Sequence, residues 1–293
     1  MSEVQPLTKR IKRTFVLPLI MTAICILNIE NVIKGMRQAL DICTISIIPS
    51  LFVFMVLSDL TVTLLLDEDT INIPLKFTVF VIGSICGFPI GATICDKLCY
   101  KNILSKKDAA KIIPFCNNAS PAFVIGAIGV SILGSSKLGF LLYISQILSA
   151  LIPMLFIKTR FLNYKFSAKK SSVTDTFFSA IEKAIFGILK TCAIICIFTV
   201  IVQLLKKYSM PYASVLLEIS NGINFCISLK ETNPLLAFAM CGFCCGFSGL
   251  CVHMQIKSML KHIDIEMSYL FMCKLMQGIL SFIFSLFGYY LFF

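Results

Sequence analysis

Only a few residues of this sequence combine a chemically useful type with suggestive spacing, and none of them forms a catalytic or metal-binding set. The sequence has two histidines, His253 and His262, without a nucleophile–base pair or a group of metal ligands. The C-x-x-C at 241–244 lacks a second ligand pair, so we interpret the 14 cysteines as reduced, small apolar residues of the interior. We therefore predict no enzyme, no catalytic residue, no metal site and no cofactor.

Asn117-Asn118-Ala119-Ser120-Pro121 is the first segment that suits ligand binding. It lies in the uncharged run 112–136, where unpartnered Asn and Ser side chains are costly, and Pro121 donates no backbone hydrogen bond. A helix unwound here exposes N–H and C=O groups, and the helix that restarts at Ala122 presents a partly positive N-terminus that suits an anion. The alternative is a proline kink with both Asn side chains hydrogen-bonded between helices.

Glu218 lies in a second polar cluster, Leu217-Glu218-Ile219-Ser220-Asn221-Gly222, within an apolar stretch. An ionisable residue in such a place is a functional hypothesis by default. Glu218 then binds a proton or a cation, or holds the polar donors of the unwound segment. If 212–229 instead lies on the surface, Glu218 is simply solvated.

His253 follows a glycine-rich segment that contains Ser248 and Gly249, and Gln255 adds hydrogen-bonding capacity beside it. A single histidine of this kind is usually a packing residue, but histidine also titrates near neutral pH and suits proton transfer. The coupling ion, H⁺ or Na⁺, is left open. Lys274 receives no role, because lysines near span ends usually extend to the membrane interface.

The composition requires a membrane to position these residues. Apolar residues make up 58% of the chain, charged residues 14%, and the mean hydropathy is +0.91. Such a chain uses lipid as solvent for much of its surface. Uncharged runs occur at 14–29, 42–58, 77–95, 112–136, 138–157, 191–205, 232–256 and 275–293.

Basic residues lie between these runs, in 9–13, 97–111 and 158–170, which is the pattern of cytoplasmic loops. The net charge of +11 therefore does not indicate nucleic-acid binding. An even number of crossings must separate successive cytoplasmic loops. Since 14–33 and 38–65 account for two, the Gly- and Pro-rich stretch 75–96 is predicted to enter and leave on one side as a re-entrant hairpin.

An internal repeat is indicated by G-x-x-C-G-F, which occurs at 83–88 and again at 242–247. Three predicted crossings separate the copies, so the repeats are expected to be inverted, a plan typical of secondary transporters. The alternative is that these glycines form ordinary helix-packing faces.

The predicted fold is an all-α polytopic membrane protein with about six full spans, two re-entrant hairpins and an inverted internal repeat with broken helices. The chain forms one membrane domain, 1–293. Its predicted parts are a basic segment with the first span (1–35), repeat 1 (36–165) with hairpin 75–100 and broken helix 108–134, and repeat 2 (172–293) with polar segment 212–229 and hairpin 234–260.

These segments resemble the YlbJ family, also called SpoVV, of sporulation integral membrane proteins with a nucleoside-recognition Gate domain. The resemblance runs from about Pro49-Ser50-Leu51-Phe52 almost to the C-terminus. It is carried by Gly87-Phe88-Pro89-Ile90-Gly91-Ala92, Asn117-Asn118-Ala119-Ser120-Pro121, Leu217-Glu218-Ile219-Ser220-Asn221-Gly222 and Gly246-Phe247-Ser248-Gly249-Leu250 with Val252, His253, Gln255 and Ser258.

The family is similar in plan to concentrative nucleoside transporters and is implicated in moving dipicolinic acid from the mother cell across the outer forespore membrane. The resemblance thus implies an integral protein in a membrane of a spore-forming bacterium and a small anionic solute as partner, besides lipid. Unwound segments with N–H, Asn and Ser donors suit carboxylates. The predicted binding residues are Gly87, Phe88, Pro89, Gly91, Asn117, Asn118, Ser120, Glu218, Ser220, Asn221, Ser248, Gly249, His253 and Gln255.

Two other functions stay open at this point. One is transport of nucleosides or another small solute, and the other is a non-transporting membrane gate or scaffold in a sporulation complex. Formation of a homo-oligomer also stays open.

Overall fold

The computed structural model describes residues 8–67, 75–159 and 172–292 of the 293-residue chain, and every regular element among them is a helix. The prediction of an all-α protein is therefore confirmed. The predicted cytoplasmic loop 158–170 lies outside the described residues except for its first two positions.

In chain order, the helices are α1 (Thr8–Leu27), α2 (Ile29–Asp41), η1 (Ile42–Ile47), α3 (Ile48–Asp67), α4 (Leu75–Cys86), α5 (Ile90–Tyr100), α6 (Lys106–Cys116), η2 (Ala122–Ile132), α7 (Ser136–Phe156), α8 (Val173–Lys207), η3 (Pro211–Ala213), α9 (Ser214–Leu217), α10 (Ile219–Ser228), α11 (Pro234–Phe247), α12 (Gly249–Met259) and α13 (Met267–Phe292).

Polar capping residues set several of the helix starts. Ser105 accepts a hydrogen bond from the Asp108 backbone at the start of α6 (3.0 Å), and Asn233 accepts one from Leu236 at the start of α11 (3.0 Å). Each cap satisfies a backbone N–H that the first helical turn leaves without a partner. Helices that are apolar along their length can therefore begin at defined positions.

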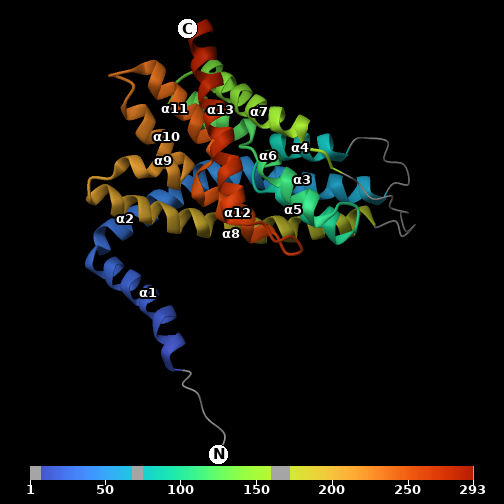
Figure 1. Cartoon of the computed structure of the whole chain (residues 1–293), viewed down its shortest axis with the longest axis horizontal. Coiled ribbons are helices and arrows are strands. Elements are labelled where there is room, and N and C mark those ends of the chain that lie inside the picture. The colour runs from blue at the N-terminus through green and yellow to red at the C-terminus, as the bar shows by residue number, and fades with distance from the viewer. Residues whose placement is uncertain (1–7, 68–74, 160–171, 293) are drawn as a thin grey trace, which may run out of the picture.

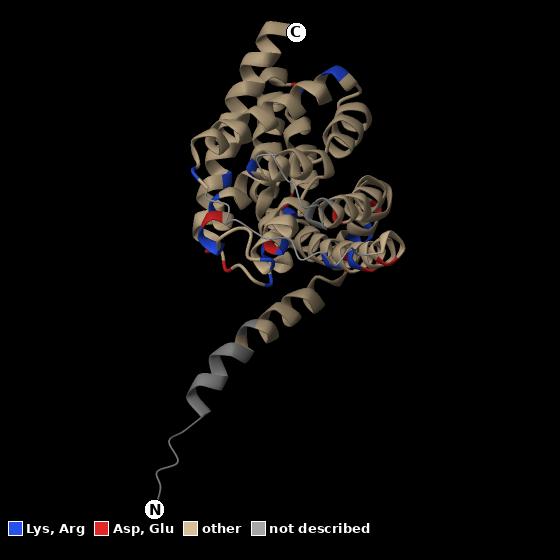
Figure 2. Ribbon diagram, turned by 90° about the vertical axis from the view of Figure 1, so that its right-hand side faces the viewer, with Lys and Arg blue, Asp and Glu red and all other residues tan. Residues whose placement is uncertain are grey.

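Helices α2 and α3 follow one another through η1 along the long axis of the molecule, α8 lies alongside both, and α13 is steeply inclined to them (Figure 1). Helix α1 contacts the neighbouring α2 and projects from the body in both ribbon views (Figures 1 and 2). In Figure 2, most charged residues lie in the lower part of the helical body, and the helices in its upper part carry few of them.

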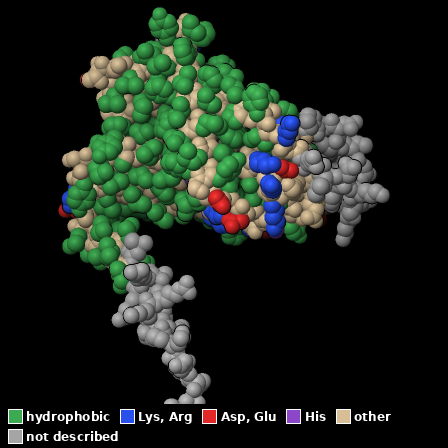
Figure 3. All heavy atoms as spheres, viewed as in Figure 1, with side chains coloured by type: hydrophobic (Ala, Val, Ile, Leu, Met, Phe, Trp, Pro, Cys, Tyr) green, Lys and Arg blue, Asp and Glu red, His purple; other side chains and the backbone are tan. Residues whose placement is uncertain are grey.

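The outer surface of the body is largely apolar. Figure 3 shows hydrophobic side chains over most of one face, with charged side chains gathered toward the end where α5 lies. On α8, Phe186, Leu189 and Ile197 are 67%, 60% and 61% exposed. A surface of this kind is stable against lipid rather than water, as the composition predicts.

Five helical stretches are long and apolar enough to cross a membrane, whereas the sequence predicts about six spans. They are Ile29–Leu64, Ser136–Phe156, Val173–Lys207, Pro234–Met259 and Met267–Phe292. Helix bounds near the N-terminus differ from the predicted spans 14–33 and 38–65, because the first helix ends at Leu27 and a long apolar helix begins at Ile29. Asn28 lies at this junction, where its side chain accepts a hydrogen bond from Lys207 of α8 (2.5 Å) and donates to Ile24 (2.8 Å).

Small residues join α11 to α13. A β-carbon on Gly242 would lie 2.1 Å from the Ser285 hydroxyl, and one on Gly246 would lie 2.7 Å from the Ser281 side chain. Such small residues let two helices pack with their backbones close together. The glycines of the second G-x-x-C-G-F copy therefore serve helix packing, which is the alternative that the sequence left open for them.

Candidate functional site

The segment Asn117-Asn118-Ala119-Ser120 separates α6 from η2 and lies inside the protein. Helix α6 ends at Cys116, and η2 begins at Ala122. All four residues of the segment are at most 1% exposed. The predicted helix 108–134 therefore contains an interruption at this polar segment, which we call the first break.

Both Asn side chains of the first break bind protein groups. The Asn117 side-chain oxygen accepts from Ala92 N at the start of α5 (3.0 Å), and its amide donates to Ile113 O (2.6 Å). Asn118 donates to Ser84 of α4 (3.1 Å) and to Phe115 O (2.9 Å). These contacts hold the short helices α4 and α5 against the first break.

The turn between α4 and α5 brings the other first-repeat candidates to the same place. Gly87 has a φ of +88°, and a β-carbon there would lie 3.0 Å from the Ser120 side chain and 3.2 Å from Ser120 N. Phe88, Pro89 and Gly91 follow in this turn and the start of α5, and all three are buried. The structure therefore brings Gly87, Phe88, Pro89 and Gly91 together with the first break.

Lys274 of α13 also reaches the first break, although its position in the sequence predicts no role for it. Its side chain is 0% exposed, and its ammonium donates to Asn117 O (3.1 Å) and to the Gln277 side chain (2.7 Å). Gln277 in turn donates to the Asn118 side chain (2.8 Å). No Asp or Glu among the described residues forms an ion pair with Lys274.

A second break separates α11 from α12 at Ser248. Ser248 and Gly249 have φ values of +68° and +74°, and the Ser248 hydroxyl donates to Cys245 O (3.0 Å). A β-carbon on Gly249 would lie 3.0 Å from Leu217 O and 3.2 Å from Glu218 N, so the junction of α9 and α10 touches this break. Ser248, Gly249 and Glu218 are therefore neighbours in the fold.

Glu218 is buried at 2% exposure and caps α10. Its carboxylate accepts hydrogen bonds from Ser220 N (3.1 Å), Asn221 N (2.9 Å) and the Asn221 amide (2.7 Å). The surface alternative for Glu218 is therefore wrong. The carboxylate completes the first turn of a buried helix, where it also meets the positive end of the helix dipole.

Asn221 connects Glu218 to the helices around it. Its side-chain oxygen accepts from Gln38 of α2 (2.8 Å), and Gln203 of α8 donates to Gln38. Ser220 is half-buried and takes part in this network through its backbone N–H, which donates to Glu218. The cluster of Glu218, Asn221, Gln38 and Gln203 therefore ties α10 to the long helices α2 and α8.

His253 lies on α12, one turn beyond the second break, and is 0% exposed. Its Nε2 lies 3.1 Å from Phe247 O, and its ring meets the rings of Phe247 and Phe271 edge to face, with centroids 5.0 and 6.2 Å apart. Gln255 is 1% exposed and donates to the Cys251 sulfur (3.3 Å). His253 faces α13 through Phe271, whereas Gln255 binds within α12.

One short stretch of α13 contacts both breaks. Lys274 and Gln277 bind the first break, while Phe271 packs on Phe247 and a β-carbon on Gly278 would lie 2.9 Å from the Phe247 side chain. These α13 residues, 271–278, extend over about 10 Å of helix. The two breaks therefore both lie against this stretch of α13.

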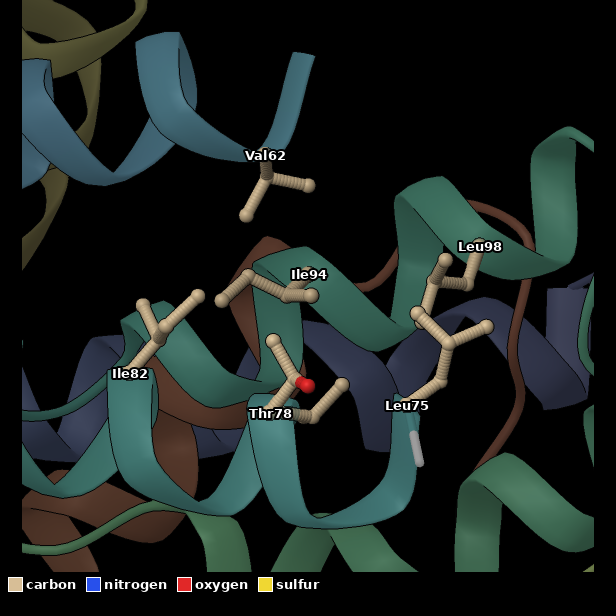
Figure 4. A pocket seen from close by; sticks show the side chains of 7 residues that line it. Val62, Leu75, Thr78, Ile82, Ile94 and Leu98 are labelled. Atoms are coloured by element: carbon tan, nitrogen blue, oxygen red, sulfur yellow. The ribbon is translucent and has the colours of Figure 1, made fainter. Parts of the chain in front are cut away.

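A cavity of about 20 Å³ lies elsewhere, between α3, α4 and α5 (Figure 4). Its walls are Val62, Leu75, Thr78, Val79, Ile82, Ile94 and Leu98. The Thr78 hydroxyl is the single polar side-chain group in this lining, so the cavity does not suit an anion. Among the described residues, no group of three or more His, Cys, Asp or Glu side chains is arranged to hold a metal ion.

The chain is similar to the sporulation integral membrane protein YlbJ of Bacillus subtilis (strain 168), with 23% identity over 253 residues. The match covers 70% of this chain and 62% of that protein, so the chain spans less than two thirds of its relative's length. The resemblance to the YlbJ/SpoVV family is confirmed by this match. No family model matches the chain, and no solved structure matches it significantly.

Proposed function

We propose that this chain is a sporulation membrane transporter that moves a small organic anion, dipicolinate, across the outer forespore membrane. The similarity to a sporulation integral membrane protein supports the setting. We propose an anion as the solute because the ammonium of Lys274 is buried at the first break.

When it is protonated, Lys274 places a positive charge inside the protein that its hydrogen-bond partners do not neutralise. Its partners are the neutral Asn117 carbonyl and Gln277 amide oxygens. Burial of an ion costs several kcal/mol unless an opposite charge accompanies it. A carboxylate of the solute, bound beside the first break, supplies that opposite charge.

The start of η2 adds a second reason for an anion at the first break. Ala122 begins an 11-residue helix, with Pro121 as its N-cap, and the N-terminal end of this helix faces the polar segment. The Ser120 hydroxyl accepts from Phe123 N there (3.3 Å). The backbone donors and dipole of such an end favour negative charge, in the same direction as Lys274.

The predicted division into two repeats is part of this proposal and is supported by the order of the helices. The order long helix, short helical pair, interrupted helix, long helix occurs as α3, α4 with α5, α6 with η2, and α7, and again as α8, α9 with α10, α11 with α12, and α13. In each half the short pair touches the following break, through Gly87 and Ser120 in one and Glu218 and Gly249 in the other. We therefore equate hairpin 75–100 with segment 212–229, and treat 234–260 as the counterpart of broken helix 108–134.

Uptake of dipicolinate into vesicles that contain the purified protein tests the function. Lys274→Gln keeps a hydrogen-bond donor near Asn117 but removes the charge. A charged hydrogen bond contributes about 1.5–3 kcal/mol, so we expect uptake at low solute concentration to fall roughly 10- to 100-fold. The matched control is Lys190→Gln, at an exposed position of α8, which is expected to transport normally.

Two results would count against the proposal. Equal uptake by the Lys274→Gln protein and the wild type would remove Lys274 from the site. Absence of dipicolinate uptake and binding by the folded wild-type protein would favour the scaffold alternative, for which the satisfied hydrogen bonds of Asn117 and Asn118 are packing contacts. Stronger thermal stabilisation by nucleosides than by dipicolinate would favour a nucleoside transporter.

A further inference from the structure

His253 has one ring nitrogen without a partner. Because the Phe247 carbonyl accepts hydrogen bonds only, the nitrogen 3.1 Å from it, Nε2, carries the proton. Nδ1 is then an acceptor, and it is buried without a hydrogen-bond partner among the described residues. An unsatisfied buried polar atom costs about 1–3 kcal/mol, so its presence calls for an explanation.

Glu218 is the other residue of the second half that the sequence offers as a proton carrier, and its carboxylate is already hydrogen-bonded. Three N–H groups, from Ser220 and Asn221, already bind its carboxylate. Protonation of this carboxylate would weaken the cap of α10. Of the two residues that the sequence offers as proton carriers, His253 is therefore the one with a free site for a proton.

The position of His253 relates this free site to the anion. Its ring packs on Phe271, which lies one helical turn before Lys274 on α13. A proton on Nδ1 therefore adds a second positive charge near that of Lys274. Two positive charges match the two carboxylates of a dianion, whereas Lys274 alone matches one.

We propose that His253 takes up a proton together with a dicarboxylate and releases it with the solute, so that transport is coupled to protons. This inference rests on the proposed function. The proton comes from water on the side where the solute enters, forms an N–H bond at Nδ1, and returns to water on the other side. The rings of Phe247 and Phe271 pack against the imidazole, and such apolar surroundings disfavour its charged form while the solute is absent.

Lys274 and several other charged groups lie on the helices around α12. Lys274 is the charged group that faces His253 from α13. Glu218 binds the start of α10, and Asp96 of α5 accepts from Lys261 N (3.0 Å) and His262 N (2.8 Å). On α8, Lys183 pairs with Asp59 (3.0 Å).

The test compares wild-type protein, His253→Gln and a control, His262→Gln, in vesicles with an imposed pH gradient. Glutamine at 253 keeps a donor for Phe247 O but cannot carry a proton at physiological pH. We expect acid on the solute side to stimulate wild-type dipicolinate uptake several-fold, and dipicolinate entry to raise the pH of that side. We expect His253→Gln to lose both effects, and His262→Gln, which is partly exposed in the loop after α12, to keep them.

A second measurement uses wild-type protein alone and does not depend on the folding of a variant. Acid is expected to strengthen binding of dipicolinate more than binding of picolinate, which has one carboxylate. Proton-independent dipicolinate uptake by the wild type, or an unchanged pH response in folded His253→Gln, would overturn the role of His253 and leave the proposed function intact. Absence of any dipicolinate uptake by the wild type would overturn the proposed function itself.

Discussion

Replacement of Gly91 by alanine is expected to force α5 away from the first break. A β-carbon at Gly91 would lie 2.1 Å from the carbonyl oxygen of Cys116 and 2.7 Å from its carbonyl carbon. Both atoms belong to the backbone, so no side-chain rotation relieves the contact. The end of α6 or the start of α5 must move instead.

The expected size follows from two opposing effects. Alanine is favoured over glycine in a helix by about 1 kcal/mol. Extra atoms forced into a packed interior cost about 1–3 kcal/mol, and occasionally more. With the closest contact made to rigid backbone, we expect a net loss of about 1–2 kcal/mol, together with lengthening of the 3.0 Å bond between Ala92 N and the Asn117 side chain.

Thermal unfolding of the purified protein in detergent measures this loss. Gly126→Ala is the matched control, because a β-carbon at Gly126 would meet no heavy atom within 4 Å. We expect Gly91→Ala to lower the Tm by several degrees and to reduce dipicolinate uptake, with little change for Gly126→Ala. Equal Tm values for the two variants would refute the close packing of α5 on the first break.

Two further predictions concern buried carboxylates. Glu218→Ala removes the cap of α10 and leaves N–H groups of Ser220 and Asn221 unsatisfied, so we expect the free energy of unfolding to fall by about 1–3 kcal/mol. Thermal unfolding measures this loss, with Glu231→Ala at an exposed position as the control. Asp96→Ala removes the carboxylate that accepts hydrogen bonds from the backbone N–H groups of Lys261 and His262, so we expect faster amide hydrogen exchange at 260–266. Unchanged exchange there would contradict the role of Asp96 in holding this loop.

The interrupted segment 117–120 could be found from sequence because its signal is local. Two Asn residues, a Ser and a Pro within an uncharged run are incompatible with an ordinary lipid-facing helix, whatever surrounds them. The same reasoning selected Glu218, and burial of its carboxylate decided between the alternatives for it.

Lys274 had no such signal. It lies next to the uncharged run 275–293, so run lengths place it at the end of a span, where a lysine side chain extends to the interface. In the structure α13 begins at Met267, seven residues earlier, and packs so that Lys274 points to Asn117. The start of this helix and its neighbours, rather than local composition, determine the surroundings of that ammonium.

The pairing of the repeats also depended on tertiary contacts. The shared motif G-x-x-C-G-F pairs 83–88 with 242–247, whereas the pairing that we propose follows the contacts, in which Gly242 and Gly246 pack on α13 and the turn at Gly87 touches the first break. Short motifs of small residues recur wherever helices approach closely, so similar letters do not identify equivalent positions.

Sequence alone determined that this chain is helical, is a membrane protein and carries polar interruptions in its apolar segments. Hydropathy, charge and proline determine these features because their effect on the backbone is local to a few residues. Only the tertiary structure decided which interruptions meet. The surroundings of Lys274 depend on groups more than a hundred residues away in the sequence. Folding brings Asn117 within hydrogen-bonding distance of Lys274, and Asn118 within hydrogen-bonding distance of its partner Gln277.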